Sequence, residues 1–119
     1  MEKSLPHDMQ RIVQELVPGR QLTLAHAIAN PDASLYKAIG LDSQEGGAMG
    51  ILTLSPSEAA IIAGDIAIKA SGVNLGFVDL EKGSLLITGR LSAVESALIA
   101  VRAYVRDKLG FAVCELKRT

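Results

Sequence analysis

Two alanine-rich segments with helical periodicity constrain the fold of this chain more than any other feature. They cover residues 56–71 and 93–109, and each is followed closely by a glycine, Gly72 in the first case and Gly110 in the second. Glycine is the residue that most often adopts the left-handed conformation at the end of a helix. We therefore predict two helices that stop at these glycines.

The starts of both segments share a serine followed three residues later by a glutamate. The pairs are Ser55 with Glu58 and Ser92 with Glu95. In a capping box of this kind, the two side chains accept hydrogen bonds from backbone N–H groups that have no partner at the start of a helix. We therefore expect both helices to begin directly after these serines.

Apolar runs that are typical of β-strands lie before and after each helix. They cover residues 48–54, 73–80, 83–89 and 111–116. A tight turn at residues 81–83 joins the second run to the third, which predicts an antiparallel hairpin. The order from residue 48 onward is thus βαββαβ, the ferredoxin-like unit of an α+β fold, with both helices on one face of the sheet.

The first 47 residues are too few for a second hydrophobic core, so we expect them to add to this unit. Residues 11–17 and 22–29 have strand-like patterns, and residues 32–39 have the pattern of a short helix. Residues 1–10 are expected to be disordered. The prediction is a single domain over residues 11–119 that carries an extra N-terminal strand segment and a short helix.

Composition excludes several classes of protein. The chain has 119 residues, of which 49% are apolar and only 3% aromatic, and its net charge is -1. Without a basic cluster, neither nucleic acid nor an anionic membrane surface is an expected partner. No apolar run approaches the ~18 residues needed to cross a bilayer, and no signal peptide is present, so we expect a cytosolic protein. A domain of this size leaves apolar surface exposed, here built from small aliphatic side chains.

Side chains capable of catalysis are few. The chain has one cysteine, Cys114, and two histidines, His7 and His26. Cys114 and His26 both lie in predicted strands, so a nucleophile and base pair is one interpretation, and simple packing of both residues is the other. Metal-binding and phosphate-binding motifs are missing from the sequence. We therefore predict no enzyme activity, no cofactor and no metal site within one chain.

Three segments of the sequence resemble a known family. They are RIVQELVPGRQLTLAHAIANP, GILTLSPSEAAIIAGDIAIK and LGFVDLEKGSLLITG. Together they resemble the circularly permuted shell proteins of bacterial microcompartments, of the kind found in propanediol- and ethanolamine-utilisation organelles. The resemblance covers residues 11–119. It implies a BMC domain with a permuted terminus, which forms homohexamers that tile into the polyhedral shell around a metabolic enzyme core.

The resemblance also implies roles for individual residues. Contacts between hexamers at their edges fall on Lys69, Asn30 and His26, and Asn30 stands where unpermuted relatives have an arginine. The turn near the sixfold axis and pore consists of Asp79, Leu80, Glu81, Lys82 and Gly83. The strand that pairs with its five copies into a β-barrel over the pore consists of Arg11, Ile12, Val13, Gln14, Glu15, Leu16 and Val17.

The residues themselves leave other interpretations open. Lys69 follows Asp65 by four positions, so it can simply form an ion pair within its helix. Residues 79–82 are equally typical of a solvated turn. Gly46 and Gly47 permit unusual backbone angles, and we hypothesise that they let the subunit bend.

Two functions from different classes remain to be compared. The first is the shell protein, whose partners are its own copies, other shell proteins and a targeting peptide of an encapsulated enzyme. The second is a ferredoxin-like regulatory module that binds a small metabolite at a subunit interface. The sequence does not indicate which metabolic pathway is served, whether hexamers are flat or bent, or whether the barrel binds cargo or only closes the pore.

Overall fold

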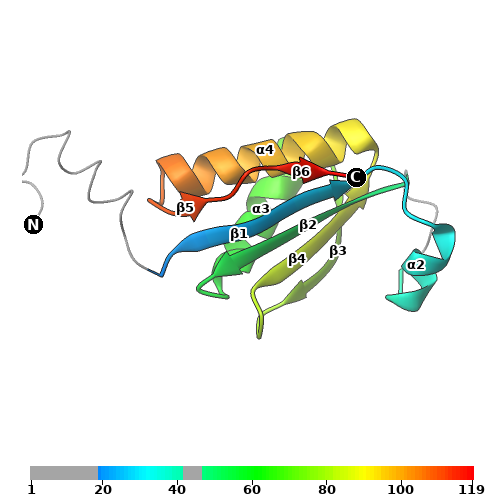
Figure 1. Cartoon of the computed structure of the whole chain (residues 1–119), viewed down its shortest axis with the longest axis horizontal. Helices are drawn as coiled ribbons and strands as arrows, with labels where there is room; N and C mark the ends of the chain where they lie inside the picture. Colours follow the sequence, from blue (N-terminus) through cyan, green and yellow to red (C-terminus); the bar gives the residue numbers. More distant parts are fainter. Residues whose placement is uncertain (1–18, 42–46) are drawn as a thin grey trace, which may run out of the picture.

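The computed structural model describes residues 19–41 and 47–119 (Figure 1). Its elements in chain order are β1 (Gln21–Ile28), α2 (Ala33–Ala38), β2 (Ala48–Ser55), α3 (Ala59–Ser71), β3 (Asn74–Asp79), β4 (Ser84–Gly89), α4 (Leu91–Asp107), β5 (Ala112–Val113) and β6 (Lys117–Arg118). The predictions for residues 1–10, for the barrel strand at 11–17 and for Gly46 lie outside the described residues.

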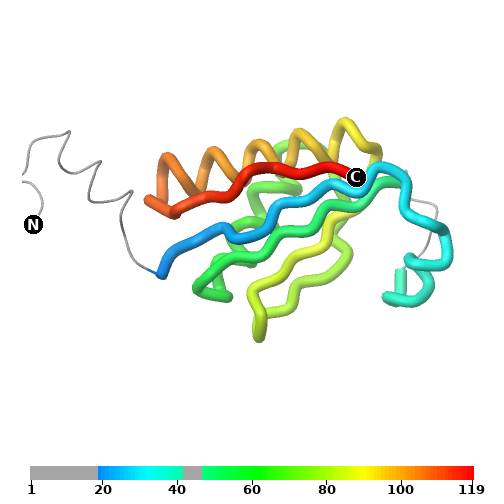
Figure 2. The backbone as a smooth tube through the Cα atoms, in the orientation of Figure 1, coloured from blue at the N-terminus to red at the C-terminus, as the bar shows by residue number. Residues whose placement is uncertain are grey.

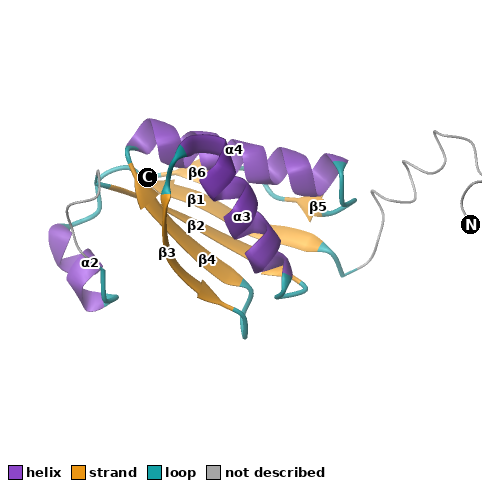
Figure 3. Cartoon of the chain, turned by 180° about the vertical axis from the view of Figure 1, so that it is seen from behind, coloured by secondary structure: helices purple, strands orange, loops and turns teal. Residues whose placement is uncertain are grey.

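One sheet organises the described residues. Its strand order is β3-β4-β2-β1-β5, with β6 also paired to β1. The β3–β4 hairpin is antiparallel, as predicted, and β4 is antiparallel to β2. Helices α3 and α4 cover the same face of this sheet (Figure 3). The βαββαβ order from β2 to β5, with both helices on one face, is therefore confirmed.

The last strand is shorter than predicted and lies in a different place. Only Ala112–Val113 and Lys117–Arg118 form strands in this part of the chain, and both pair in parallel with β1. Strand β1 itself pairs antiparallel with β2 over its whole length. In a ferredoxin-like unit the last strand lies beside the first, and here β1 occupies that place. The C-terminal tail, residues 110–119, follows β1 along the outer edge of the sheet (Figure 2). This placement is expected when the order of elements is permuted.

The predicted capping boxes are wrong at both helices. Ser55 is the last residue of β2, where it pairs with Gln21, and α3 begins at Ala59 without a side-chain cap. Instead, carbonyl groups of residues 56–58 accept hydrogen bonds from the first N–H groups of α3. Helix α4 begins at Leu91 after Arg90 in extended conformation, so Ser92 already lies inside the helix.

The helix ends agree better with the sequence. Gly72 follows α3 in the left-handed conformation, with φ of 65°. Helix α4 ends at Asp107, three residues before Gly110, which also has a positive φ. The short helix predicted at residues 32–39 is present as α2, and the Asp32 side chain caps it by accepting a hydrogen bond from the N–H of Ser34 at 2.9 Å. The hydrogen bonds from Ser34 lower the pKa of the Asp32 carboxyl.

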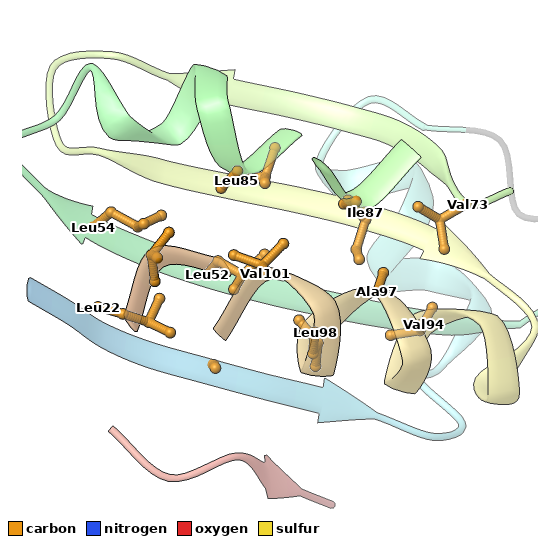
Figure 4. Packing of buried hydrophobic residues seen from close by; sticks show 14 of the residues in the cluster. Leu22, Leu52, Leu54, Val73, Leu85, Ile87, Val94, Ala97, Leu98 and Val101 are labelled. Carbon is orange, nitrogen blue, oxygen red and sulfur yellow. The ribbon is translucent and has the colours of Figure 1, made fainter. Parts of the chain in front are cut away.

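Helices α3 and α4 pack on the sheet in one hydrophobic core, in which Val94, Leu98 and Val101 of α4 lie over the strands (Figure 4). The fully buried residues of α3 are alanines and a glycine, and Ile66 is partly buried against the same core. Across from them lie Leu52, Leu85 and Ile87, all with no measurable exposure. A second, smaller cluster on the opposite face of the sheet joins Tyr36 of α2 to Met49 and Leu86. Helix α2 therefore covers one end of the face that α3 and α4 leave open.

Candidate functional site

The predicted functional residues are divided between two opposite ends of the sheet. The turn at residues 79–83 joins β3 to β4 at one end, and β1 begins at the same end. Asn30 follows β1 at the other end, and Gly47 precedes β2 there. Lys69 lies in the last turn of α3, just before β3 begins at this second end. Figure 1 shows α2 at the second end, far from the hairpin turn.

The turn at the first end is held by hydrogen bonds of its own. Asp79 Oδ1 accepts hydrogen bonds from the N–H groups of Glu81 at 2.9 Å and Lys82 at 3.3 Å. The N–H of Gly83 donates to the carbonyl oxygen of Asp79 at 2.8 Å, and the Gly83 carbonyl accepts from the N–H of Leu54 at 2.8 Å. The Asp79 carboxylate therefore stabilises the turn itself. The side chains of residues 80–82 are exposed to solvent.

The chain enters the sheet close to this turn. Thr53 of β2 pairs with Ser84 of β4, and the next residue of β2, Leu54, pairs with Leu22 of β1. Strands β4, β2 and β1 are direct neighbours. At about 4.8 Å per strand, the start of β1 lies roughly 10 Å from the end of the hairpin. Any segment that precedes Gly19 therefore begins beside the turn.

The three residues predicted to contact a neighbouring hexamer do not form one cluster within the chain. Lys69 Nζ lies 3.0 Å from Asp65 Oδ2, and the two side chains are 75% and 60% exposed. Asn30 is exposed and lines a shallow depression together with Gly47. His26 is half-buried, and its Nε2 lies 3.0 Å from Thr119 Oγ1. The ion pair within the helix is thus present, and the role at a hexamer edge remains a prediction.

Cys114 and His26 do not form a catalytic pair. The side chains of Ala25 and Ala27 pack in the core beneath the helices, so His26 between them points to the opposite face of the sheet. Cys114 packs against that same core, and its N–H donates to the carbonyl oxygen of Leu22. Within residues 19–41 and 47–119, no three His, Cys, Asp or Glu side chains gather as metal ligands. Nor does any helix there have the length and hydropathy of a membrane span.

The structure also shows where apolar surface is left exposed, which the composition could not locate. Among the exposed apolar side chains are Ile61 and Ile68 of α3 and Leu75 of β3. Ile99 of α4 and Leu116 after β5 are also exposed, and both line one cavity. A periodicity analysis could have found Ile61, Ile68 and Ile99, because they fall outside the buried stripes of their helices. The proximity of Leu75 and Leu116 to these helices depends on the sheet.

Residues 48–115 match the family model described as the BMC domain. The chain belongs to this family. The bacterial microcompartment shell protein EutS of Salmonella typhimurium is 48% identical over 110 residues, covering 92% of this chain and 97% of EutS. The shell protein PduU of the same organism is 49% identical over 109 residues, covering 92% of this chain and 93% of PduU.

A solved structure agrees with this assignment. The flat hexamer of CutR matches with a TM-score of 0.81 and 41% identity, covering 87% of this chain and 94% of the CutR chain. The BMC fold and the prediction of a structural component of a bacterial microcompartment shell, not an enzyme, are confirmed. The family match begins at Ala48, so β1 and α2 precede the matched domain, whereas EutS and PduU match nearly the whole chain.

Proposed function

We propose that this chain forms a homohexameric tile of the microcompartment shell, with the β3–β4 turn nearest the sixfold axis and the α2 end at the periphery. The separation of the two sets of residues to opposite ends of one sheet is the observation that carries this proposal. A subunit of a ring needs an inner and an outer end, and the sheet spans the distance between them. The CutR hexamer supports the same stoichiometry.

The pore is covered by a β-barrel built from residues 11–17 of six chains. Support comes from the entry of the chain beside the axial turn, because six segments that all start near the axis can reach one another. Each strand supplies hydrogen-bonding partners for its neighbours, and closure into a barrel removes exposed strand edges. Such a barrel would also present a surface to a targeting peptide of an encapsulated enzyme.

Contacts with neighbouring hexamers involve Lys69, Asn30 and His26. Lys69 is free to change its partner, because an exposed ion pair within a helix is worth only about 0.3–0.5 kcal/mol. Gly46 and Gly47 let the subunit bend. Gly47 supports this role with a φ of 86°, a conformation that few other residues adopt.

Light scattering coupled to size-exclusion chromatography tests the hexamer, for which six times the chain mass of 12.5 kDa is expected. A monomer or dimer at high concentration would contradict the proposal. Negative-stain microscopy then tests the edge. The Lys69→Ala variant should keep its hexamers and lose extended sheets, whereas Lys82→Ala, an exposed lysine at the axial end, should keep both. Sheets of Lys69→Ala as extensive as those of the wild type would refute the edge role.

The barrel needs a separate measurement. A density map of the full-length hexamer should show a small sixfold barrel over the axis, and a map of a variant that lacks residues 1–17 should show an open axis in an otherwise unchanged ring. A full-length hexamer without density over the axis contradicts the barrel and leaves the tile intact.

A further inference from the structure

The C-terminal tail lies beside β1 in one constant register. Strand β5 pairs with the start of β1 and β6 with its end, and the difference in residue number between partners is the same in both places. A glycine with a positive φ stands two positions before the first pair on each side, Gly19 before Gln21 and Gly110 before Ala112. The tail therefore repeats the course of β1 one strand farther out (Figure 2).

The tail also turns its side chains toward the same face of the sheet as β1. Three core-facing positions of β1 have a counterpart in the tail, namely Leu22 with Val113, Ala25 with Leu116 and Ala27 with Arg118. Val113 packs against the core, and Leu116 and Arg118 line a cavity together with Leu98 of α4. A sideways shift of the tail by one strand spacing, about 4.8 Å, therefore brings these side chains to the places of their counterparts without turning the strand over.

The order of elements favours the same shift. In a ferredoxin-like unit, the strand that follows the second helix lies beside the first strand of the unit. The tail directly follows α4, and it already runs antiparallel to β2, because it is parallel to β1 and β1 is antiparallel to β2. Residues 48–119 thus contain all the strands and helices of the unit without β1, and the family model matches residues 48–115 within them.

We propose that the tail is a reserve strand, which takes the place of β1 beside β2 when β1 leaves the sheet. In this exchanged arrangement, residues 48–119 keep a complete βαββαβ unit. Lys117 then stands opposite Ile51, in the place that His26 has in the observed sheet. The exchange occurs within one chain and does not depend on the hexamer proposed above.

Side-chain size explains why β1 holds this place in the observed structure. Ala25 and Ala27 are only 1% and 2% exposed, so little room separates this part of β1 from the helices. Leu116 and Arg118 are larger, and inserting them overfills the core and buries a charge. Glu95 offsets part of this cost, because it lines the same cavity as Ala27 and its Oε2 already lies 3.4 Å from Arg118 Nε. The exchanged arrangement is therefore the minor state.

Engineered disulfides distinguish the two arrangements in the full-length chain. In the observed sheet, Lys117 and Ile51 are two strands apart, roughly 10 Å, whereas a disulfide needs Cα atoms within about 7 Å. The parent variant carries Lys117→Cys and Ile51→Cys together with Cys114→Ser, and it should form an intrachain disulfide only when the tail has replaced β1. The pair His26→Cys with Ile51→Cys in the same background is the matched control, because these two residues are direct neighbours in the observed sheet.

Two further substitutions shift the balance in opposite directions. Ala25→Asp places a carboxylate in the core only while β1 is in the sheet, so it should raise the rate of disulfide formation in the parent variant by roughly tenfold or more. Leu116→Asp buries a carboxylate only in the exchanged arrangement, so it should lower that rate by a similar factor. Leu116 is 36% exposed in the observed structure, and this variant should fold normally. Circular dichroism checks folding, and Ala25→Ser is a milder substitute if Ala25→Asp does not fold.

Non-reducing peptide mapping by mass spectrometry identifies the disulfide, and the mass of a single chain shows that it is intrachain. A slow disulfide in the parent variant that forms faster with Ala25→Asp and more slowly with Leu116→Asp supports the reserve strand. No intrachain disulfide in the parent variant, under conditions that oxidise the control pair completely, would overturn it. Equal rates with and without Leu116→Asp would also overturn it, because they would show that the tail reaches Ile51 by fraying and not by entering the core.

Discussion

Replacing Gly83 by alanine should destabilise the protein much more than the same replacement at Gly72. Both glycines have a positive φ, 74° at Gly83 and 65° at Gly72, so alanine is strained at either position. Their surroundings differ. A methyl group at Gly83 would overlap the carbonyl oxygen of Leu54, whereas one at Gly72 meets no atom within 4 Å. Comparing the two variants therefore isolates the close approach of the turn to β2.

The expected losses of stability follow from the backbone strain at both glycines and from the steric overlap at Gly83. The left-handed conformation costs a residue with a Cβ atom roughly 1–2 kcal/mol. Forcing a methyl group into an occupied space costs typically ~1–3 kcal/mol, and here the obstacle is backbone, which moves less easily than a side chain. Gly72→Ala should therefore lower the free energy of unfolding by about 1–2 kcal/mol, and Gly83→Ala by about 2–5 kcal/mol.

Urea denaturation at one fixed protein concentration measures this difference, since association contributes to apparent stability. With a slope of about 2 kcal/mol per molar urea, the midpoint should fall by roughly 0.5–1 M for Gly72→Ala and by roughly 1–2.5 M for Gly83→Ala. Equal shifts for the two variants would refute the reasoning, because they would show that the turn can move away from Leu54 without cost.

Two other substitutions test different parts of the structure. Leu52→Ala removes a side chain with no exposed surface, and the resulting cavity should lower the free energy of unfolding by about 2–5 kcal/mol in urea, whereas Leu80→Ala at the exposed turn should change it by less than ~0.5 kcal/mol. Gly47→Val should flatten a bent hexamer, because valine strongly disfavours the positive φ observed there, and a crystal structure with unchanged curvature would disprove the bend.

Agreement between sequence and structure is closest where neighbours along the chain decide the conformation. The β3–β4 hairpin and the end of α3 at Gly72 depend on a few consecutive residues. The capping boxes failed for the opposite reason. Ser55 has the right local pattern, but its pairing with Gln21 keeps it in β2, so the serine is unavailable as a helix cap.

In the candidate site too, the sequence predicts the features that depend on neighbouring residues, and the fold decides those that depend on distant ones. The turn at residues 79–83 could be located from the sequence, and the structure adds that the Asp79 carboxylate is already used within it. The pairing of Cys114 with His26 was open in the sequence, because strand patterns do not fix which face two separate strands share. The sheet places them on opposite faces.

The sequence by itself determined the order of helices and strands from residue 48 onward and the family resemblance, because periodicity and motifs are properties of consecutive residues. Tertiary structure alone decided that β1 lies between β2 and the C-terminal residues, and that Leu75 of β3 lies beside Gly64 of α3. These arrangements depend on pairing between distant segments, such as Gln21 with both Ser55 and Ala112. Strand pairing depends on a register that no local pattern specifies, and the register decides which side chains share a face of the sheet.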